Sequence, residues 1–551
     1  DLKAGSQQLE FAVPLDADPL EVWDLQVETE ILTKEEVAKE APLWSGKVLV
    51  GVPRTLQEEA AVEWAQYRRD FLAEYIHKPA NDTVAAQAME TMVLEGFYRG
   101  AWEDIDYLDK RRGGAAKWAP LNHLERLLEM ARAYADVHSR YYKDPQMWEL
   151  VMLGLEFWYR NRAALVNPGW VHNEITVPDL ILDILILLDR ESPVHLVDFV
   201  KSRLDLQRDF KDVGQNLPWR LLTHIKLAVL LNEPANLRVI YRRLGDEIRL
   251  APDLKREEWR HSRWQGYVGL DFTYTYVEGI QVDYSFHQHG PMLHSGSYGM
   301  GFLTYSARLA YVARNTQLFP SESLANLVDM VLEGQQWMVW PQQFDYSVLG
   351  RAIAGRGSGN AGALLRAVQW LRQIPGVPRE ADLLLLEKRL RGEEQPLLGN
   401  RYFWTSDYMV HRRPGFMATI RMASQEAVAT EIVSWMNMKG HLVADGCMYL
   451  YQDGKEYADV FVTWDWLRIP GTTTEQKALP VVERQHDSIR GAGELVGGVS
   501  DGYYGCAGMY LNRDSLSARK SWFLFDQEIV DLGTDIRCPT NNHVVTTINQ
   551  N

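Results

Sequence analysis

The segment DYSFHQHGPMLHSGSYGMG, residues 283–301, is the densest group of side chains in the sequence that could do chemistry. It contains His287, His289 and His294, and Tyr298 follows the second histidine at a spacing of nine residues. The segment offers few apolar residues to a core, and Gly-rich polar loops of this kind are functional more often than structural. We therefore expect a functional site here.

Two chemistries fit these residues. His287 and His289 are spaced like alternate residues of a strand and could bind a metal ion together with a carboxylate such as Asp283. Alternatively, one of the histidines and Tyr298 could act as an acid/base pair. A third interpretation is that the imidazoles only bond to backbone groups of the loop. The residues alone leave all three open.

A second segment, FDYSVLGRAIAGRGSGNAG, places Arg351 and Arg356 in a Gly- and Ala-rich stretch. Guanidinium groups on such a loop suit bidentate recognition of a carboxylate or sulfate. A phosphate-binding loop is disfavoured because the GxxxxGK[ST] spacing and its Lys are absent. Solvated surface arginines are the alternative for either residue.

A third segment, DVGQNLPWRLLTH, carries Asn216 shortly before Pro218, at an expected helix start, with Trp219 and Arg220 beside it. An Asn at this place is usually a helix cap. Taken by itself, this segment is therefore a weak functional signal.

The composition limits the class of protein. A chain of 551 residues is too long for one hydrophobic core, so two or three domains are expected. The formal charge of −16 argues against a general nucleic-acid binder, and an anionic substrate would require a local cationic cleft. The 19 Trp and 25 Tyr provide flat amphipathic surfaces that stack on sugar rings or fill large cores.

Other classes of site have weaker support. Cys447, Cys506 and Cys538 lack CxxC spacing, which indicates neither a disulfide framework nor a zinc site, and we expect them to be small buried residues. No apolar run reaches membrane-spanning length and no signal peptide is recognisable. Because the chain begins at Asp1 rather than Met, we interpret it as a mature or trimmed form.

Residues 51–392 show the periodicity of helices. Within HLERLLEMARAYADVH, apolar residues at spacings of three and four form one stripe that comprises Leu124, Leu127, Leu128, Ala131 and Tyr134. Similar segments occur at 178–191, 217–231, 323–338 and 361–373. Helices of this length with short links predict helical hairpins in an α/α toroid or solenoid, and the lack of a fixed-length repeat weakens the solenoid.

Residues 393–551 alternate in β-branched and aromatic residues with Gly and Asp between them, which predicts an antiparallel β-sandwich. Because the sequence stops at INQN without a closing turn, we expect this β domain to be incomplete. Residues 1–50 are harder to interpret and could edge a small β module. The expected fold class is therefore α+β and multidomain, with an N-terminal α/α toroid followed by the sandwich.

Taken together, these segments resemble polysaccharide lyase family 8, the hyaluronate, chondroitin and xanthan lyases. The family pairs a helical toroid with a β-sandwich, and its histidine and tyrosine are nine residues apart. Its motif S-[FY]-x-Q-H-G-…-Y-G is matched by Ser285, Phe286, Gln288, His289, Gly290, Tyr298 and Gly299.

Three further motifs are similar to those of the family, with departures. WVHNEITVP resembles NWWHNEIGxP, but Gly169 and Val171 stand where the family has Asn and a second Trp. VGQN, which ends at Asn216, resembles TGAN, whose Asn is catalytic in the family. GRAIAGR resembles GRAISR, with one extra residue between Arg351 and Arg356.

The expected sandwich carries the remaining motifs. In ATEIVSWMNMKGHLVADG, Glu431 and Asn437 match the family's YExxNxENxxGxxxxDG pattern, whereas Ser434 and Met436 replace Asn and Glu. DVFVTWDWLRIPGTT and ARKSWFLF match its sandwich signatures. The resemblance covers roughly residues 100 to 551, and its weight comes from six motifs in the same order.

The resemblance implies a lyase that cleaves a uronate-containing glycosaminoglycan of the chondroitin sulfate or hyaluronan type by β-elimination, leaving an unsaturated 4,5-uronate end. The implied catalytic residues are Asn216, His289, Tyr298, Arg351 and Glu431. The implied substrate-binding residues are Trp170, His172, Asn173, Trp219, Gln288, Arg356 and Asn437. Trp170 is favoured over Trp219 for stacking on a sugar ring.

In the implied mechanism, Asn216 and His289 neutralise the uronate carboxylate while Tyr298 takes the C5 proton and then protonates the departing O4. Since a phenol is a weak base at neutral pH, we expect Arg351 to lower the pKa of Tyr298. Glu431 would orient Arg351 or the tyrosine. No metal is needed for catalysis and no cofactor is required; a structural Ca²⁺ is compatible with such a protein, but nothing in the sequence indicates one.

The resemblance also implies an acidic polysaccharide as the partner, with no nucleic acid and no membrane, and a monomer that is secreted or periplasmic in a bacterium. Three alternatives stay open: a lyase for xanthan or an alginate-like polymer, a hydrolytic or metal-dependent glycosidase on the same toroid, and a carbohydrate-binding protein without activity. The sequence leaves open the polymer, its sulfation, endo or exo action, and whether His289 serves as the base for iduronate.

Overall fold

The computed structural model describes residues 54–111, 117–188, 192–251, 278–355, 357–433, 435–481 and 486–550. Residues 1–67 and 68–551 form two compact units, and of the first only Arg54–Tyr67 is described, within helix α1 (Arg54–Phe71). The expected β module at residues 1–50 and the side chain of Arg356 lie outside the described residues.

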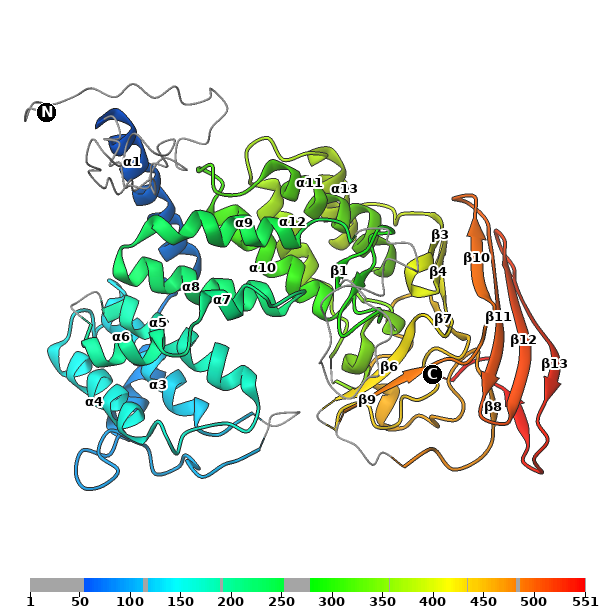
Figure 1. The fold of residues 1–551 in the computed structure, drawn as a ribbon, viewed down its shortest axis with the longest axis horizontal. Helices are drawn as coiled ribbons and strands as arrows, with labels where there is room; N and C mark the ends of the chain where they lie inside the picture. Colours follow the sequence, from blue (N-terminus) through cyan, green and yellow to red (C-terminus); the bar gives the residue numbers. More distant parts are fainter. Residues whose placement is uncertain are drawn as a thin grey trace, which may run out of the picture. The chain divides into compact units, whose positions relative to one another are not determined.

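The region after α1 is helical, as expected (Figure 1). One set of helices, each of which packs against the next, comprises α3 (Leu121–Ala135), α5 (Val177–Leu188), α8 (Asn216–Leu231), α10 (Tyr298–Val312) and α12 (Gly362–Arg372). A second set packs on these in the same order and comprises α4 (Pro145–Asn161), α6 (Val194–Lys201), α9 (Leu237–Glu247), α11 (Ser321–Asp329) and α13 (Glu380–Leu390). This pairing corresponds to the expected helical hairpins.

Burial of apolar stripes explains the first set of helices. The whole predicted stripe of α3 is buried, and α5, which is apolar almost all round, buries most of its residues.

The segment predicted at 323–338 differs from a single helix. It continues beyond α11 as a π-helical turn (Met330–Gly334) and a 3₁₀ turn (Gln335–Met338), where the Gln335 side chain donates to the backbone oxygen of Ser295.

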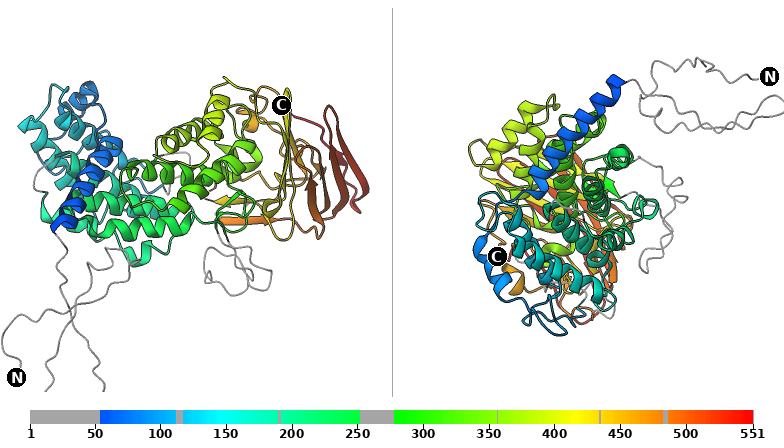
Figure 2. Two further views of the ribbon diagram at one scale, coloured as in Figure 1. Left: turned by 90° about the horizontal axis from the view of Figure 1, so that it is seen from above. Right: turned by 90° about the vertical axis from the view of Figure 1, so that its left-hand side faces the viewer.

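The C-terminal region contains two four-stranded antiparallel sheets, shown in Figure 2. The first runs in the order β3 (Gly399–Phe403), β4 (Tyr408–Arg413), β5 (Phe416–Arg421) and β7 (Cys447–Tyr451). The second runs in the order β10 (Val496–Ser500), β11 (Gly505–Arg513), β12 (Leu516–Leu524) and β13 (Ile529–Arg537). The pairs β6 (Val428–Val433) with β9 (His486–Arg490), and β8 (Thr473–Glu475) with β14 (Val544–Thr546), complete the described strands.

The two large sheets share one hydrophobic core, which makes this region the predicted sandwich. Met409 and Ile420 of the first sheet lie in the same buried cluster as Met509 and Trp522 of the second.

Cys447 is buried as expected, whereas Cys506 and Cys538 are half-buried, and all three are free thiols. None of the helices that the structure describes has the length and apolar character to cross a membrane.

Candidate active site

A short hairpin presents His289. Strand β2 (Phe286–His287) pairs with β1 (Gly279–Ile280), and His287 also pairs with Leu293, so the chain turns between them with His289 at the turn. The backbone of His289 has a φ of 59°, in the left-handed region that costs a non-glycine residue energy. Such strain is characteristic of residues that the fold holds for a functional reason.

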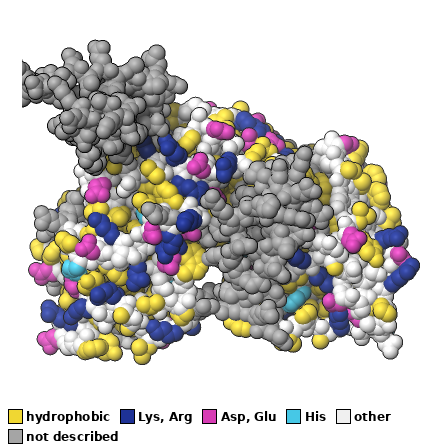
Figure 3. All heavy atoms as spheres, viewed as in Figure 1, with side chains coloured by type: hydrophobic (Ala, Val, Ile, Leu, Met, Phe, Trp, Pro, Cys, Tyr) yellow, Lys and Arg dark blue, Asp and Glu magenta, His cyan; other side chains and the backbone are white. Residues whose placement is uncertain are grey.

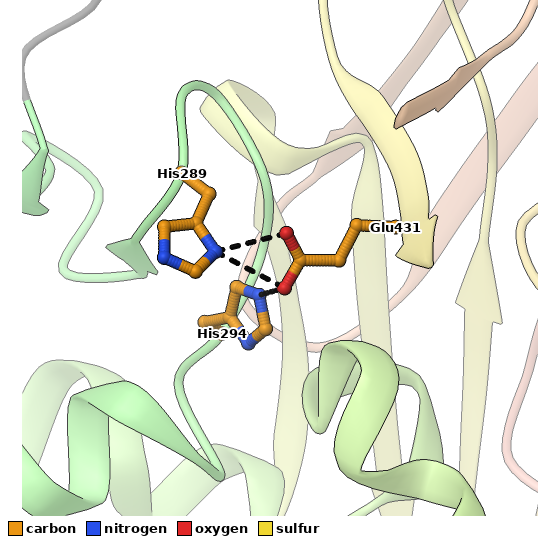
Figure 4. Close-up of side chains that lie close together, drawn as sticks. All are labelled: His289, His294 and Glu431. Atoms are coloured by element: carbon orange, nitrogen blue, oxygen red, sulfur yellow. Dashed lines mark hydrogen bonds and ion pairs between the residues drawn. The ribbon is translucent and has the colours of Figure 1, made fainter. Parts of the chain in front are cut away.

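The same hairpin lies beside strand β6, which carries Glu431. Met292 pairs in parallel with Val428, and the backbone N–H of Val428 donates to Pro291. As a result, the carboxylate of Glu431 reaches His289: its two oxygens lie 2.9 and 3.1 Å from Nδ1, as Figure 4 shows. The side chain of Glu431 is 3% exposed.

The charges of this pair follow from their surroundings. Burial raises the pKa of Glu431, but the imidazole of His289 and the guanidinium of Arg351 overcome that effect and hold the pKa well below its usual range. Burial lowers the pKa of His289, but the Glu431 carboxylate overcomes it and raises the pKa above its ordinary value. Glu431 is therefore an anion that favours protonation of His289.

Arg351 connects this pair to Tyr298. It lies in a 3₁₀ helix (Gly350–Ala354) that packs against β6, and one of its terminal nitrogens donates to Glu431 while the other donates to the phenol oxygen of Tyr298. The ring centroids of His289 and Tyr298 are 5.1 Å apart. Four of the predicted catalytic residues therefore form one contact network.

Tyr298 is the first residue of α10, where the helix dipole favours negative charge. Burial nevertheless raises its pKa, and the guanidinium of Arg351 offsets only part of the increase. The expectation that Arg351 brings this pKa below its ordinary value is thus wrong in its net direction. The free protein holds Tyr298 as a neutral phenol that accepts a hydrogen bond from a cation.

Asn216 is the first residue of α8, beside the start of α10. A Cβ added to Gly301, in the first turn of α10, would lie 2.9 Å from the side chain of Gln215. The cap position of α8 is Gln215, without a side-chain capping bond, so the expected capping role of Asn216 is wrong. The half-buried Asn216 side chain makes no hydrogen bond to any residue in the described ranges, which leaves its amide available to a ligand.

Gln288 and Asn437, predicted to bind substrate, are both buried and bonded within the protein. The side-chain oxygen of Gln288 accepts a 2.8 Å bond from the backbone N–H of Gln215, next to Asn216, while its nitrogen donates to Glu278. The nitrogen of Asn437 donates to the Glu431 backbone oxygen at 3.1 Å. These contacts hold the backbone at or beside two of the predicted catalytic residues, Asn216 and Glu431; contact of Gln288 or Asn437 with a substrate stays a prediction.

Trp219 is a residue of α8, and Trp170 lies beside Arg220 of the same helix. The guanidinium of Arg220 lies 5.1 Å from the ring centroid of Trp170, and Arg220 is itself held by Glu174. Trp219 packs edge-on against Tyr305 of α10 at 6.4 Å. Both Trp side chains are half-buried, so the structure is compatible with a sugar-stacking role for either one.

His172 and Asn173 belong to the π-helical turn that precedes α5. The His172 ring stacks on Trp118 at 5.8 Å. The side chain of Asn173 bonds within its own loop. Its amide nitrogen donates to the backbone oxygens of Asn167 and Gly169, and its amide oxygen accepts from the N–H of Asn167. Their predicted contact with substrate remains untested.

The metal site expected as one alternative is not assembled. His287 Nε2 lies 2.8 Å from the hydroxyl of Ser406, and Asp283 accepts bonds from the hydroxyls of Ser285 and Thr405. Burial lowers the pKa of His287 to about 3, so it is a neutral structural imidazole.

Within the described ranges, one other group has possible metal ligands close together: His289, His294 and Glu431, with ligand atoms within 4.8 Å of one another. Arg351 already donates to this carboxylate and lies 3.3 Å from His289 Nδ1. A fixed positive charge at that place opposes a second cation. The donor set therefore fits a hydrogen-bonded acid/base site better than a metal centre.

His294 belongs to the histidine cluster of the sequence but had no predicted role, and Glu278 was not among the predicted site residues. His294 points at the same carboxylate as His289 (Figure 4). The described part of the face in Figure 3 carries Lys and Arg side chains interspersed with acidic ones, so the net charge of −16 leaves room for local positive regions. The clustering of three histidines was the only sequence signal for His294.

Comparison with known proteins agrees with this geometry. The family description "Polysaccharide lyase family 8, N terminal alpha-helical domain" matches residues 69–211 and 270–380, and "Polysaccharide lyase family 8, super-sandwich domain" matches 398–551. Chondroitinase-AC of Pedobacter heparinus is 28% identical over 481 residues, which cover 85% of this chain and 63% of the relative. Hyaluronate lyase HylB of Enterococcus faecalis is 23% identical, over 87% of this chain and 52% of the relative.

A solved chondroitinase AC lyase, described from enzyme–oligosaccharide complexes and mutagenesis, has a TM-score of 0.75 and 26% identity, over 89% of this chain and 68% of that one. The chain thus spans between about half and two thirds of the length of the curated relatives. Helical domain, sandwich and ordered motifs all coincide, and the chain belongs to polysaccharide lyase family 8.

Proposed function

We propose that this chain is a lyase that cleaves a uronate-containing glycosaminoglycan of the chondroitin sulfate or hyaluronan type by β-elimination. The observation that carries the proposal is a phenol oxygen, that of Tyr298, bonded by Arg351, which shares the carboxylate of Glu431 with His289. These groups supply a proton acceptor, a cation beside it and an imidazole for the substrate carboxylate.

The difficult step is removal of the C5 proton, because the adjacent carboxylate must become a dianionic enolate. Donors placed where this charge develops lower the barrier. The amide of Asn216, which bonds to none of the residues that the structure describes, and the imidazole of His289 are the groups suited to this task. The Nδ1–H of His289 donates to Glu431, and its other ring nitrogen points away from that carboxylate, as Figure 4 shows.

Tyr298 then moves the proton. The phenol first gives its own proton to solvent, and the resulting phenolate takes the C5 proton. The C5 electron pair then forms the C4–C5 double bond, and the C4–O4 bond breaks. The phenol returns a proton to O4, which leaves Tyr298 as a phenolate for the next cycle. Because its pKa is raised in the free protein, Arg351 and the positive end of α10 have to stabilise this phenolate.

The remaining attributes are part of the same proposal. The chemistry above uses hydrogen bonds and the charges of side chains, and it calls for no cofactor. We expect an acidic polysaccharide as the partner and a monomeric protein. A polymer of this kind does not cross a membrane, which supports a secreted or periplasmic location in a bacterium.

The test is a panel of chondroitin sulfates, dermatan sulfate, hyaluronan, xanthan and alginate, each followed by ultraviolet absorbance and by reducing ends. The new C4–C5 double bond next to a carboxylate absorbs, so a lyase gives both signals together. Reducing ends without absorbance would establish hydrolysis, and polymer binding without either signal would establish a binding protein.

A further inference from the structure

His294 occupies the centre of the site without reaching its surface. Its side chain is 0% exposed, and its ring centroid lies 5.1 Å from that of Tyr298 and 6.1 Å from that of His289. Its Nε2 lies 3.4 Å from an oxygen of Glu431 (Figure 4). The carboxylate thus faces two imidazoles and one guanidinium.

The partners of His294 determine where its proton lies. An ionised carboxylate only accepts hydrogen bonds, so the proton on Nε2 is directed at Glu431. Nδ1 lies 2.8 Å from the hydroxyl of Ser297, which can donate to it when the ring proton is on Nε2. Burial lowers the pKa of His294 to about 4, so the ring is neutral at the pH of catalysis.

The backbone beside Arg351 is shaped around this ring. Gly350 has a φ of 55°, and a Cβ at that position would overlap the imidazole of His294. The imidazole therefore packs directly on the chain that leads into Arg351. His294 touches the carboxylate that holds Arg351 and also the backbone that positions it.

We infer that His294 is a positioning residue of the site, whose Nε2–H faces Glu431 as an electrostatic contact at 3.4 Å, without a formed hydrogen bond, and thereby helps to fix His289 and Arg351 around Tyr298. The inference rests on the proposed function. Without this donor, one carboxylate oxygen keeps only cationic partners that can rotate with it. Since His294 is fully buried, it acts on the orientation of its neighbours and does not contact the substrate.

Two amide substitutions distinguish whether His294 acts through its N–H group or only fills space in the interior. His294→Gln places an N–H at the reach of Nε2, whereas the shorter His294→Asn reaches only to the place of Nδ1. We expect the Gln variant to keep kcat within about threefold and the Asn variant to lose about tenfold to a hundredfold, with KM unchanged in both, because a shift near 1 Å has effects of this size. Equal kcat in the two variants, or a raised KM, would overturn the inference.

His287→Asn is the matched control. His287 is also buried in the same hairpin, but its partner is Ser406 and not Glu431. We expect this variant to lower the melting temperature about as much as His294→Asn does while kcat stays near that of the wild type. A matching loss of kcat in the control would show that any buried imidazole of the hairpin is needed for folding alone.

A measurement without substrate separates this inference from the proposed function. In ¹⁵N-histidine-labelled protein, we expect His294 to remain a neutral Nε2–H tautomer from about pH 5 to 8, the range in which an ordinary imidazole titrates. A titrating His294, or an Nδ1–H tautomer, contradicts the inference even if the enzyme is a lyase. The expected tautomer in a protein that cleaves none of the polymers leaves the positioning intact and rejects the proposed function.

Discussion

Glu431 and Asp345 are both buried carboxylates with a tyrosine close by, and they differ in their partners. Glu431 is bonded by His289 and Arg351, and its pKa is held well below the usual range. Asp345 is bonded by the hydroxyls of Tyr408 and Tyr451, at 2.8 and 2.7 Å, and burial raises its pKa.

The difference lies in the direction of the tyrosine hydroxyl. Around Asp345 the phenols donate to the carboxylate, which commits their protons to a structural bond. At the Glu431 site, the oxygen of Tyr298 accepts from Arg351, so its proton is free for transfer. In this comparison, the carboxylate that a cation separates from its tyrosine is the one that belongs to the candidate active site.

The largest expected effect comes from removing the Tyr298 hydroxyl. Tyr298→Phe should lower kcat by about 10²- to 10⁴-fold, the range for a lost acid/base group, with polymer affinity nearly unchanged. Initial rates from ultraviolet absorbance and calorimetric binding measure the two quantities. A variant that keeps more than a tenth of the wild-type rate would exclude Tyr298 as the proton carrier.

Tyr451→Phe is the matched control for that substitution. It removes a buried phenol oxygen whose bond to Asp345 is structural. We expect a loss of about 1–3 kcal/mol in the free energy of unfolding, because a buried acceptor loses a donor, with kcat near that of wild type.

A smaller effect is expected from removing the anion. In Glu431→Gln, burial still lowers the pKa of His289 while the charge that raised it is gone, so this pKa should fall below its ordinary value. NMR titration of the His289 ring measures it, and kcat should fall about tenfold to a hundredfold as Arg351 loses its anchor. An unchanged His289 pKa would show that Glu431 does not control that ring.

The smallest expected effect is the pH dependence of stability at Asp345. Because its pKa is raised in the folded protein, the folded state binds this proton more tightly than the unfolded chain. Its contribution to stability therefore falls as the pH rises from about 4 through the folded pKa. The contribution of Glu431 to stability depends on pH in the opposite direction, because its pKa is lowered in the folded protein. This contribution is present above about pH 4 and is lost as the pH falls.

Asp345→Asn should remove the first of these trends. Urea unfolding at a series of pH values measures the free energy of unfolding of both proteins. The difference, variant minus wild type, should grow with pH and then level off. A constant difference would mean that Asp345 has the same pKa in both states.

The sequence could predict the elements of this fold and the core of the site. The stripe of α3 and the apolar run of α5 follow from periodicity, because burying one face is what stabilises such helices. The pairing of His289 with Tyr298 follows from their short separation and a recognisable motif. Glu431 also matched a motif, but it lies 142 residues from His289. Its contact with that ring could not be predicted, because it depends on the pairing of Met292 with Val428 and on the bond from Val428 to Pro291.

Other properties of the site could not be predicted because they depend on burial. The pKa of Tyr298 rises because the effect of desolvation exceeds the effect of Arg351. The net direction of this shift cannot be derived from a pattern of residue types. Gln288 and Asn437 match a family motif, yet their side chains bond to protein groups beside Asn216 and Glu431. A motif gives the residues; the packing decides which of them face a ligand.

Strand β13 stands last in the order of its sheet, paired with β12, and most of its residues are exposed. Among the described strands β13 pairs with β12 alone, and exposed Val530 and Leu532 give it apolar area. Asp531 and Asp535 place negative charge along the same strand. Asp535 is paired with Arg537 of the same strand at 2.6 Å and lies 3.8 Å from Arg519 of β12, so this edge carries exposed ion pairs as well as apolar area, and high salt should weaken those pairs.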